Sequence, residues 1–205
     1  EPRFTIRKLP DLAQVAPTFG LAVADFDGDG RFDVFAAQNF FGPQVETGHM
    51  DGSVSLLMTG SADGTLQSVW PNRSGIVITG DAKAAATTDL NGDGWPDLLV
   101  TRNNDSLVAY RHSGTSTAAK PLAVRLVGKG ANSAAVGARV TLTMTDGRAQ
   151  LAELHAGHGY LSQSSTLYFT IPSGSQVRDL TVRWPDGSFS WHQPGDENLF
   201  VVPKP

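Results

Sequence analysis

Two segments of the chain carry oxygen-bearing side chains at alternate positions around paired glycines. The first spans residues 25–33, the second spans residues 89–97, and both follow the pattern D-x-[DN]-x-D-G-x-x-D. Side chains that alternate along a tight loop turn their oxygen atoms toward one point, and calcium accepts six to eight oxygen ligands. The two segments therefore predict two calcium sites.

Each predicted site takes four ligands from side chains and a fifth from the backbone carbonyl at the seventh loop position. The ligands expected in the first loop are Asp25, Asp27, Asp29, Asp33 and the carbonyl of Arg31. Those expected in the second loop are Asp89, Asn91, Asp93, Asp97 and the carbonyl of Trp95. Gly30 and Gly94 occupy the sixth position, where the loop turns sharply and a residue without Cβ adopts positive φ at low cost.

An EF-hand begins with the same pattern, but it also requires a glutamate at position twelve between two helices. Position twelve is Ala36 in the first segment and Val100 in the second. The flanking runs, at residues 21–24 and 97–101, are short, apolar and rich in small or β-branched residues, which favours strands. Each loop is thus predicted to join two strands. The alternative is a pair of Asp/Gly turns without metal, in which closely spaced carboxylates would repel one another.

The duplicated motif resembles the FG-GAP or VCBS repeat of integrin-alpha-like β-propellers, in which a calcium loop joins the first two strands of a blade. The later part of the chain is similar to the ASPIC/UnbV domain of cartilage acidic protein-like secreted proteins, through residues 136–141, 157–164 and 182–187. The resemblance implies an all-β protein with two propeller-type blades and a small C-terminal β-sandwich. It also implies an extracellular setting, because such repeats belong to secreted or cell-surface proteins.

Composition agrees with an all-β fold. The chain has sixteen Asp but only four Glu, together with 22 Gly and 12 Pro, and these residues favour turns over helices. Seven of the sixteen Asp lie in the two motifs, so the acidity reflects local metal chemistry. The chain has no basic run that would indicate a nucleic-acid partner, and no apolar stretch as long as a membrane span. With no cysteine, thiol catalysis is excluded.

Alternating apolar patterns give an order of strands along the chain. An isolated strand is expected at residues 4–9, and its counterpart at residues 66–70 is expected to close the first blade after strands at 21–24, 34–37 and 54–59. The second blade has strands at 85–88, 98–102 and 107–111 and no evident fourth. Two blades do not close a ring. Either the chain is the C-terminal part of a longer protein with further blades, or the two blades pack differently against the second domain, or several copies assemble; we expect the first.

We divide the chain into a repeat region at residues 1–112, a linker at 113–120 rich in Ser, Thr and Ala, and a β-sandwich at 121–205. The sandwich strands are expected at residues 122–126, 140–144, 167–171, 180–184 and 199–202, with turns at Asp146-Gly147 and Pro185-Asp186-Gly187.

Several side chains outside the loops are candidates for a function. Residues 39–50 form an insertion whose adjacent Phe40 and Phe41 are either a contact patch or a cap on the core edge. The pair His155 and His158 lacks an evident third zinc ligand. Ser162, Ser164 and Ser165 lie in no nucleophile elbow. The aromatic candidates for sugar stacking are better interpreted as core residues: Trp70, Tyr160, Trp184 and Trp191.

The sequence therefore predicts an extracellular calcium-binding module for adhesion or ligand binding, without catalytic residues, whose partner is a protein or a glycan. The alternative is a secreted carbohydrate- or matrix-active enzyme, or an ancillary domain of one. A hydrolase of that kind needs two carboxylates that face a cleft. Outside the loops most acidic residues stand next to glycine in turns, which weakens the alternative.

Overall fold

The computed structural model describes residues 3–114, 118–157 and 164–205. The first blade is a four-stranded antiparallel sheet in which each strand pairs with the next along the chain. Its strands are β1 (Thr18–Ala24), β2 (Asp33–Gln38), β3 (Leu56–Gly60) and β4 (Leu66–Val69). A short 3₁₀ helix, η1 (Asp11–Gln14), precedes the sheet, and one helical turn, α1 (Pro71–Ser74), follows it.

The second blade repeats this arrangement with three strands, β5 (Ala82–Thr88), β6 (Asp97–Arg102) and β7 (Val108–Tyr110). The strands β1 and β5 begin 64 residues apart, as do β2 and β6, so the duplicated motif corresponds to a duplicated supersecondary unit. The all-β fold class is confirmed. The three strands predicted for the second blade are confirmed as well, as is the absence of a fourth within the described residues.

The two blades pack face to face through small side chains near β1 and β5 and larger ones farther out. A Cβ on Gly20 would lie only 2.7 Å from the Cα of Ala84, so the two backbones meet where glycine leaves room. Larger apolar groups fill the space beyond, and the buried cluster consists of Ala22, Phe35, Ala37, Leu57, Ile78, Ala82, Ala85, Leu98 and Val100.

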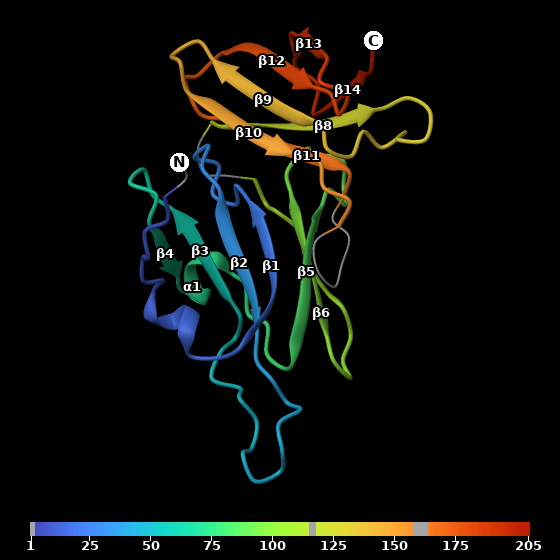
Figure 1. The fold of residues 1–205 in the computed structure, drawn as a ribbon. Coiled ribbons are helices and arrows are strands. Elements are labelled where there is room, and N and C mark those ends of the chain that lie inside the picture. Colours follow the sequence, from blue (N-terminus) through green and yellow to red (C-terminus); the bar gives the residue numbers. More distant parts are fainter. Residues whose placement is uncertain (1–2, 115–117, 158–163) are drawn as a thin grey trace.

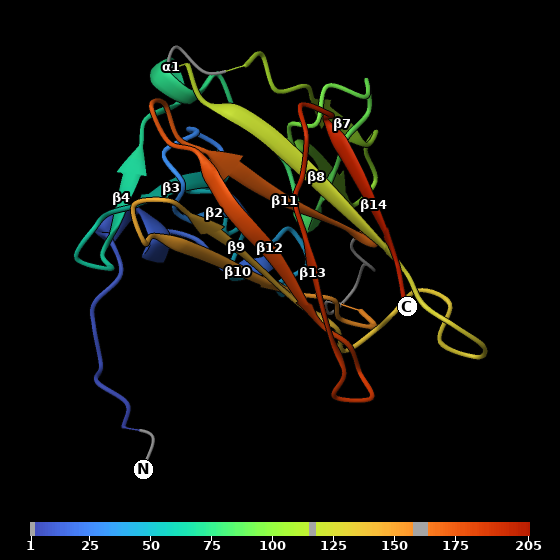
Figure 2. The same ribbon diagram turned by 90° about the horizontal axis from the view of Figure 1, so that it is seen from above.

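The remaining strands form two sheets, which lie across one end of the two blades (Figures 1 and 2). One sheet has the order β10-β9-β12-β13 and the other the order β11-β8-β14, with β14 parallel to β8. Their bounds are β8 (Lys120–Val127), β9 (Arg139–Met144), β10 (Ala149–Glu153), β11 (Thr166–Ile171), β12 (Val177–Arg183), β13 (Phe189–His192) and β14 (Leu199–Pro203). The five predicted strands and both predicted turns are confirmed, and β8 begins at Lys120, one residue before the expected boundary.

Among the residues that the structure describes, the core of this sandwich contains only side chains of the sandwich itself. It includes Leu122, Val140, Phe169, Leu180 and Trp184, all at most 2% exposed. The indole of Trp184 donates a hydrogen bond to Ser190 Oγ at 2.9 Å, which satisfies the polar group of an otherwise apolar side chain. The prediction that Trp184 is buried is confirmed.

Three expectations are wrong. Residues 4–9 form no strand, because no described strand pairs with them, and Phe4 and Ile6 are almost fully exposed. Trp70 is 60% exposed and Trp191 is 68% exposed, so neither is a core residue. Trp70 immediately precedes α1, at the point where the first blade ends, and Trp191 stacks on Phe189 on the outer face of β13, with ring centroids 6.2 Å apart.

The insertion at residues 39–50 extends from the end of β2 and returns to β3 (Figure 1). Its base is fixed by the Asn39 amide, which donates to the carbonyls of Ser53 at 2.7 Å and Gly80 at 2.9 Å. Phe40 packs near Phe19 and covers the blade edge, with ring centroids 5.6 Å apart. Phe41 instead stacks on His49 within the insertion, with centroids 4.4 Å apart.

Because the sandwich core is separate from the blade cores, we expect residues 120–205 to fold when they are expressed alone. Near-ultraviolet circular dichroism would report the fixed environment of Trp184, and a cooperative thermal transition would report the packed core. A product that precipitates or binds a hydrophobic dye would instead indicate one cooperative unit spanning the blades and the sandwich.

Candidate metal centres and an adjoining pocket

The first motif forms the loop between β1 and β2, and Asp25 organises it. The Asp25 carboxylate accepts hydrogen bonds from the backbone N–H groups of Gly28 at 2.8 Å, Asp29 at 3.2 Å and Gly30 at 2.8 Å. Gly28 and Gly30 have φ of 77° and 87°, which a residue with Cβ rarely adopts. The loop therefore curls around a single carboxylate.

This curl brings three carboxylates together. Oxygen atoms of Asp25, Asp27 and Asp29 all lie within 4.8 Å of one another. Oxygens that surround a calcium ion at about 2.3–2.6 Å are separated by up to about 5 Å. The spacing and the hard oxygen chemistry both fit calcium, and the predicted convergence of these three residues is present.

The second motif forms the loop between β5 and β6, and the two bonds from glycine N–H groups to its first aspartate are repeated. Asp89 accepts from the N–H groups of Gly92 at 2.7 Å and Gly94 at 2.8 Å. The Asn91 amide donates to Asp93 Oδ2 at 2.8 Å, a contact between side chains that both belong to the predicted ligand set. Because Asn91 replaces a carboxylate, this loop has one negative charge fewer than the first.

The last aspartate of each motif connects its loop to a later part of the blade. Asp33 is fully buried and accepts from the N–H groups of Phe26 at 2.8 Å and Gly60 at 2.9 Å. Asp97 is equally buried and accepts from Leu90 at 2.8 Å and His112 at 2.7 Å. Asp33 lies outside the group of three converging carboxylates, and its direct contact with calcium stays a prediction.

The residues at the seventh position of the two loops, Arg31 and Trp95, have different side chains but make the same backbone contact. The N–H of Arg31 donates to Asp29 at 2.8 Å, and that of Trp95 donates to Asp93 at 2.9 Å. The Arg31 guanidinium forms an ion pair with Asp29, whereas the Trp95 ring is buried and stacks on His112 with centroids 4.7 Å apart. The role of the two carbonyls as ligands stays a prediction.

Burial raises the pKa of three acidic residues of the first motif. Loss of solvation raises the pKa of Asp33 to about 7, although two backbone hydrogen bonds favour its charged form and lower the pKa. Burial also raises the pKa of Asp25 and of Asp27, and the nearby charge of Asp29 adds to the increase. A bound dication would supply the missing positive charge.

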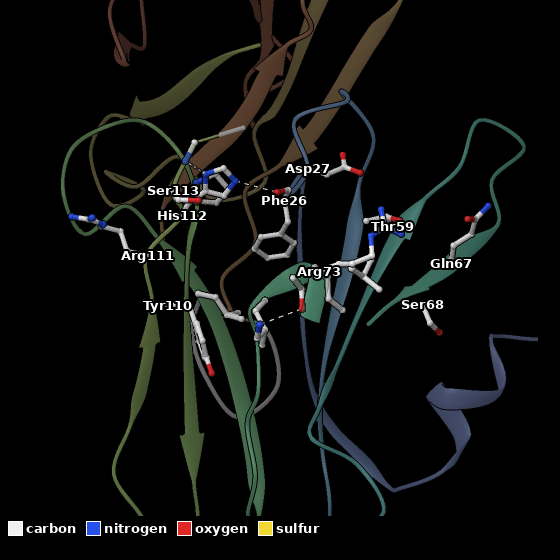
Figure 3. Close-up of a pocket in the computed structure, with 17 residues that line it drawn as sticks. Phe26, Asp27, Thr59, Gln67, Ser68, Arg73, Tyr110, Arg111, His112 and Ser113 are labelled. Carbon is white, nitrogen blue, oxygen red and sulfur yellow. Dashed lines mark hydrogen bonds between the residues drawn. The ribbon is translucent and has the colours of Figure 1, made fainter. Parts of the chain in front are cut away.

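A pocket of about 500 Å³ opens between the outer strands of the two blades (Figure 3). Apolar groups such as Leu57, Val69 and Leu98 form part of its wall. Figure 3 shows Arg73, from α1, between the labelled residues of the two blades, and Arg111 turned away from them. The pocket thus combines apolar surface with a cationic side chain, as ligand sites commonly do.

The other sequence candidates gain no catalytic geometry from the described residues. His155 is exposed beyond the end of β10, and the nearby Glu153 forms an ion pair with the Arg139 guanidinium at 2.9 Å. Ser164 lies two residues before β11 begins, and its hydroxyl accepts from the N–H of Thr166 at 3.1 Å. The candidates His158, Tyr160 and Ser162 lie outside the described residues.

Comparison with known families matches both parts of this architecture. Residues 83–117 match the model described as FG-GAP repeat, and residues 128–196 match the model described as ASPIC and UnbV. The chain combines an FG-GAP repeat with an ASPIC/UnbV domain. The resemblance drawn from the sequence is thereby confirmed. No curated protein matches the chain.

The structure extends both matches. The FG-GAP match covers the second blade. The first blade has an equivalent loop, which joins β1 and β2 as the second loop joins β5 and β6. The ASPIC/UnbV match begins after β8 and ends before β14, although both strands belong to the sandwich. FG-GAP repeats are typical of extracellular or cell-surface proteins. No helix among the described residues is long and apolar enough to span a membrane.

The raised pKa of Asp33 predicts how pH affects stability without calcium. A carboxyl group whose pKa is higher in the folded than in the unfolded chain stabilises the fold below the unfolded value, near 4, and this contribution is lost as pH rises through the folded value, about 7. In calcium-depleted buffer, we therefore expect the melting temperature to fall between pH 5 and pH 8.

Calcium should reduce this fall, because the ion stabilises the ionised carboxylates. Melting curves at matched pH values in calcium and in calcium-depleted buffer measure the difference. Parallel pH profiles under the two conditions would contradict a cation at the first loop.

Proposed function

We propose that this chain is an extracellular, calcium-binding and non-catalytic module that binds a protein or carbohydrate ligand. The observation that carries the proposal is the convergence of Asp25, Asp27 and Asp29 within 4.8 Å in a loop that joins two buried strands. The repeated hydrogen-bond pattern of the second loop supports a second site. The FG-GAP and ASPIC/UnbV matches support the extracellular, ligand-binding setting.

The proposed ligands are the ten residues that the motif specifies. They are Asp25, Asp27, Asp29, Arg31 and Asp33 in the first loop, and Asp89, Asn91, Asp93, Trp95 and Asp97 in the second. Calcium would neutralise the clustered carboxylates and hold together the ends of the two strands that each loop joins. In this role the ion stabilises the rigid scaffold on which a ligand-binding surface is built.

The inter-blade pocket favours binding over hydrolysis. Asp27 is the one carboxylate among the described residues that line it, and it belongs to the proposed calcium site. A two-carboxylate glycosidase needs a second acid across the cleft. The alternative of a carbohydrate- or matrix-active enzyme therefore has less support at this pocket.

The two functions differ in a direct assay. We expect the full chain, tested with calcium on a glycan array and against matrix proteins, to retain a ligand without turning it over. A panel of hydrolase and lyase substrates provides the comparison. Turnover that persists when calcium is saturating and disappears on Arg73→Ala or Asp27→Asn would favour the enzyme.

Calcium binding itself is tested by stability. Ligand binding to the folded state alone adds about 2.7 kcal/mol per site when free calcium is a hundred times the dissociation constant. Asp29→Ala should therefore lower the melting temperature in calcium and change it little in chelator, because it also relieves repulsion between carboxylates. Calorimetry under both conditions measures this difference.

The control is Asp146→Ala, in the turn between β9 and β10, where Asp146 is paired with Arg148. Its effect on the melting temperature should be the same with and without calcium. A wild-type melting temperature that is the same with and without chelator would contradict calcium binding by the folded chain.

A further inference from the structure

One strand of the ASPIC/UnbV domain runs past both loops. In β11 the side chains of Leu167 and Phe169 point into the sandwich core. Because side chains alternate along a strand, Tyr168 and Thr170 point to the opposite face. That face meets the two blades, and Thr170 is only 2% exposed.

Thr170 contacts the first loop. Its side chain lies beside the Asp25 carboxylate, the group around which that loop curls. The Thr170 backbone is fixed in turn by Gln150 on β10, whose side chain accepts from the Thr170 N–H at 3.1 Å and donates to its carbonyl. The loop also lies closely against this segment, since a Cβ on Gly30 would lie 2.9 Å from Pro172.

Tyr168 makes the equivalent contact with the second loop. Its hydroxyl lies beside the side chain of Thr88 and the backbone of Asp89, at the junction of β5 and that loop. The tip of the loop lies against the same sheet, because a Cβ on Gly94 would lie 3.0 Å from the carbonyl of Asn198 and 3.3 Å from Pro121. Both loops are therefore seated on the outer face of one sheet.

We propose that Thr170 and Tyr168 are positioning residues for the two calcium loops, so that docking of the ASPIC/UnbV domain raises the affinity of the loops for calcium. This inference rests on the proposed calcium function. Groups that hydrogen-bond to a metal ligand orient it, and their loss typically lowers metal affinity about 10-fold to 100-fold. By linkage, calcium in turn strengthens the docking of the domain on the blades by the same factor.

The test is calcium titration calorimetry on the full chain. Thr170→Val keeps the shape of the side chain but removes the hydroxyl, and it should weaken calcium binding about 10-fold or more at one of the two sites. Thr170→Ser restores a hydroxyl and should recover most of the affinity. Tyr168→Phe should weaken the other site and leave the one affected by Thr170→Val unchanged.

Thr141→Val is the matched control, because Thr141 is a half-buried threonine on β9, in the sheet that does not contain β11. It should leave both calcium affinities unchanged. Circular dichroism verifies that each variant is folded, and the two conservative changes, Thr170→Ser and Tyr168→Phe, keep the test decisive if Thr170→Val does not fold.

The outcomes separate the two proposals. A wild-type chain that binds no calcium would overturn the proposed function and this inference together. Two calcium sites whose affinities are the same in wild type, Thr170→Val and Tyr168→Phe would overturn this inference alone. Site-specific weakening with recovery in Thr170→Ser supports both.

Discussion

The structure depends on an electrostatic constraint: three carboxylates are held close together at the end of a blade, and the one around which the loop curls, Asp25, is buried. Backbone N–H groups arranged around Asp25 stabilise part of this charge, and the Arg31 guanidinium neutralises another part at Asp29. The fully buried Asp33 adds a further acidic group that ionises only with difficulty. The loop conformation, the close fit of the sandwich and the proposed affinity for a dication all follow from this arrangement.

The same constraint explains why the final aspartate of each motif is fixed to a distant backbone segment. Asp33 accepts from Gly60 at the end of β3, and Asp97 accepts from His112 after β7. Each carboxylate thus joins the start of the second strand of its blade to the chain that leaves the third. A metal that shifts the loop would therefore act beyond the loop itself. The hydrogen bonds connect the loop to every strand of the second blade and to three of the four strands of the first.

Sequence patterns predicted the features that depend on residues close together in the chain, namely the loops and most of the strands. The motif located both loops and the strands that flank them, and alternation located most sandwich strands. Alternation predicted a strand at residues 4–9 that does not form, because a strand also needs a neighbouring strand to pair with, and no local pattern reveals one. Trp70 and Trp191 were misplaced for a similar reason, because exposure depends on what packs above a residue. The contact of Thr170 with Asp25 joins distant parts of the chain, and nothing in either segment alone indicates it.

The gradient of side-chain size across the interface between the blades has a geometric consequence. Near β1 and β5, glycine and alanine let the backbones approach closely, whereas Phe35 and Leu57 fill the space farther out. Two sheets that are close at one edge and spread at the other form a wedge, and equal wedges stacked side by side must curve. The residue volumes at this single contact therefore define the turning angle per unit, and with it the radius of any array built from such units.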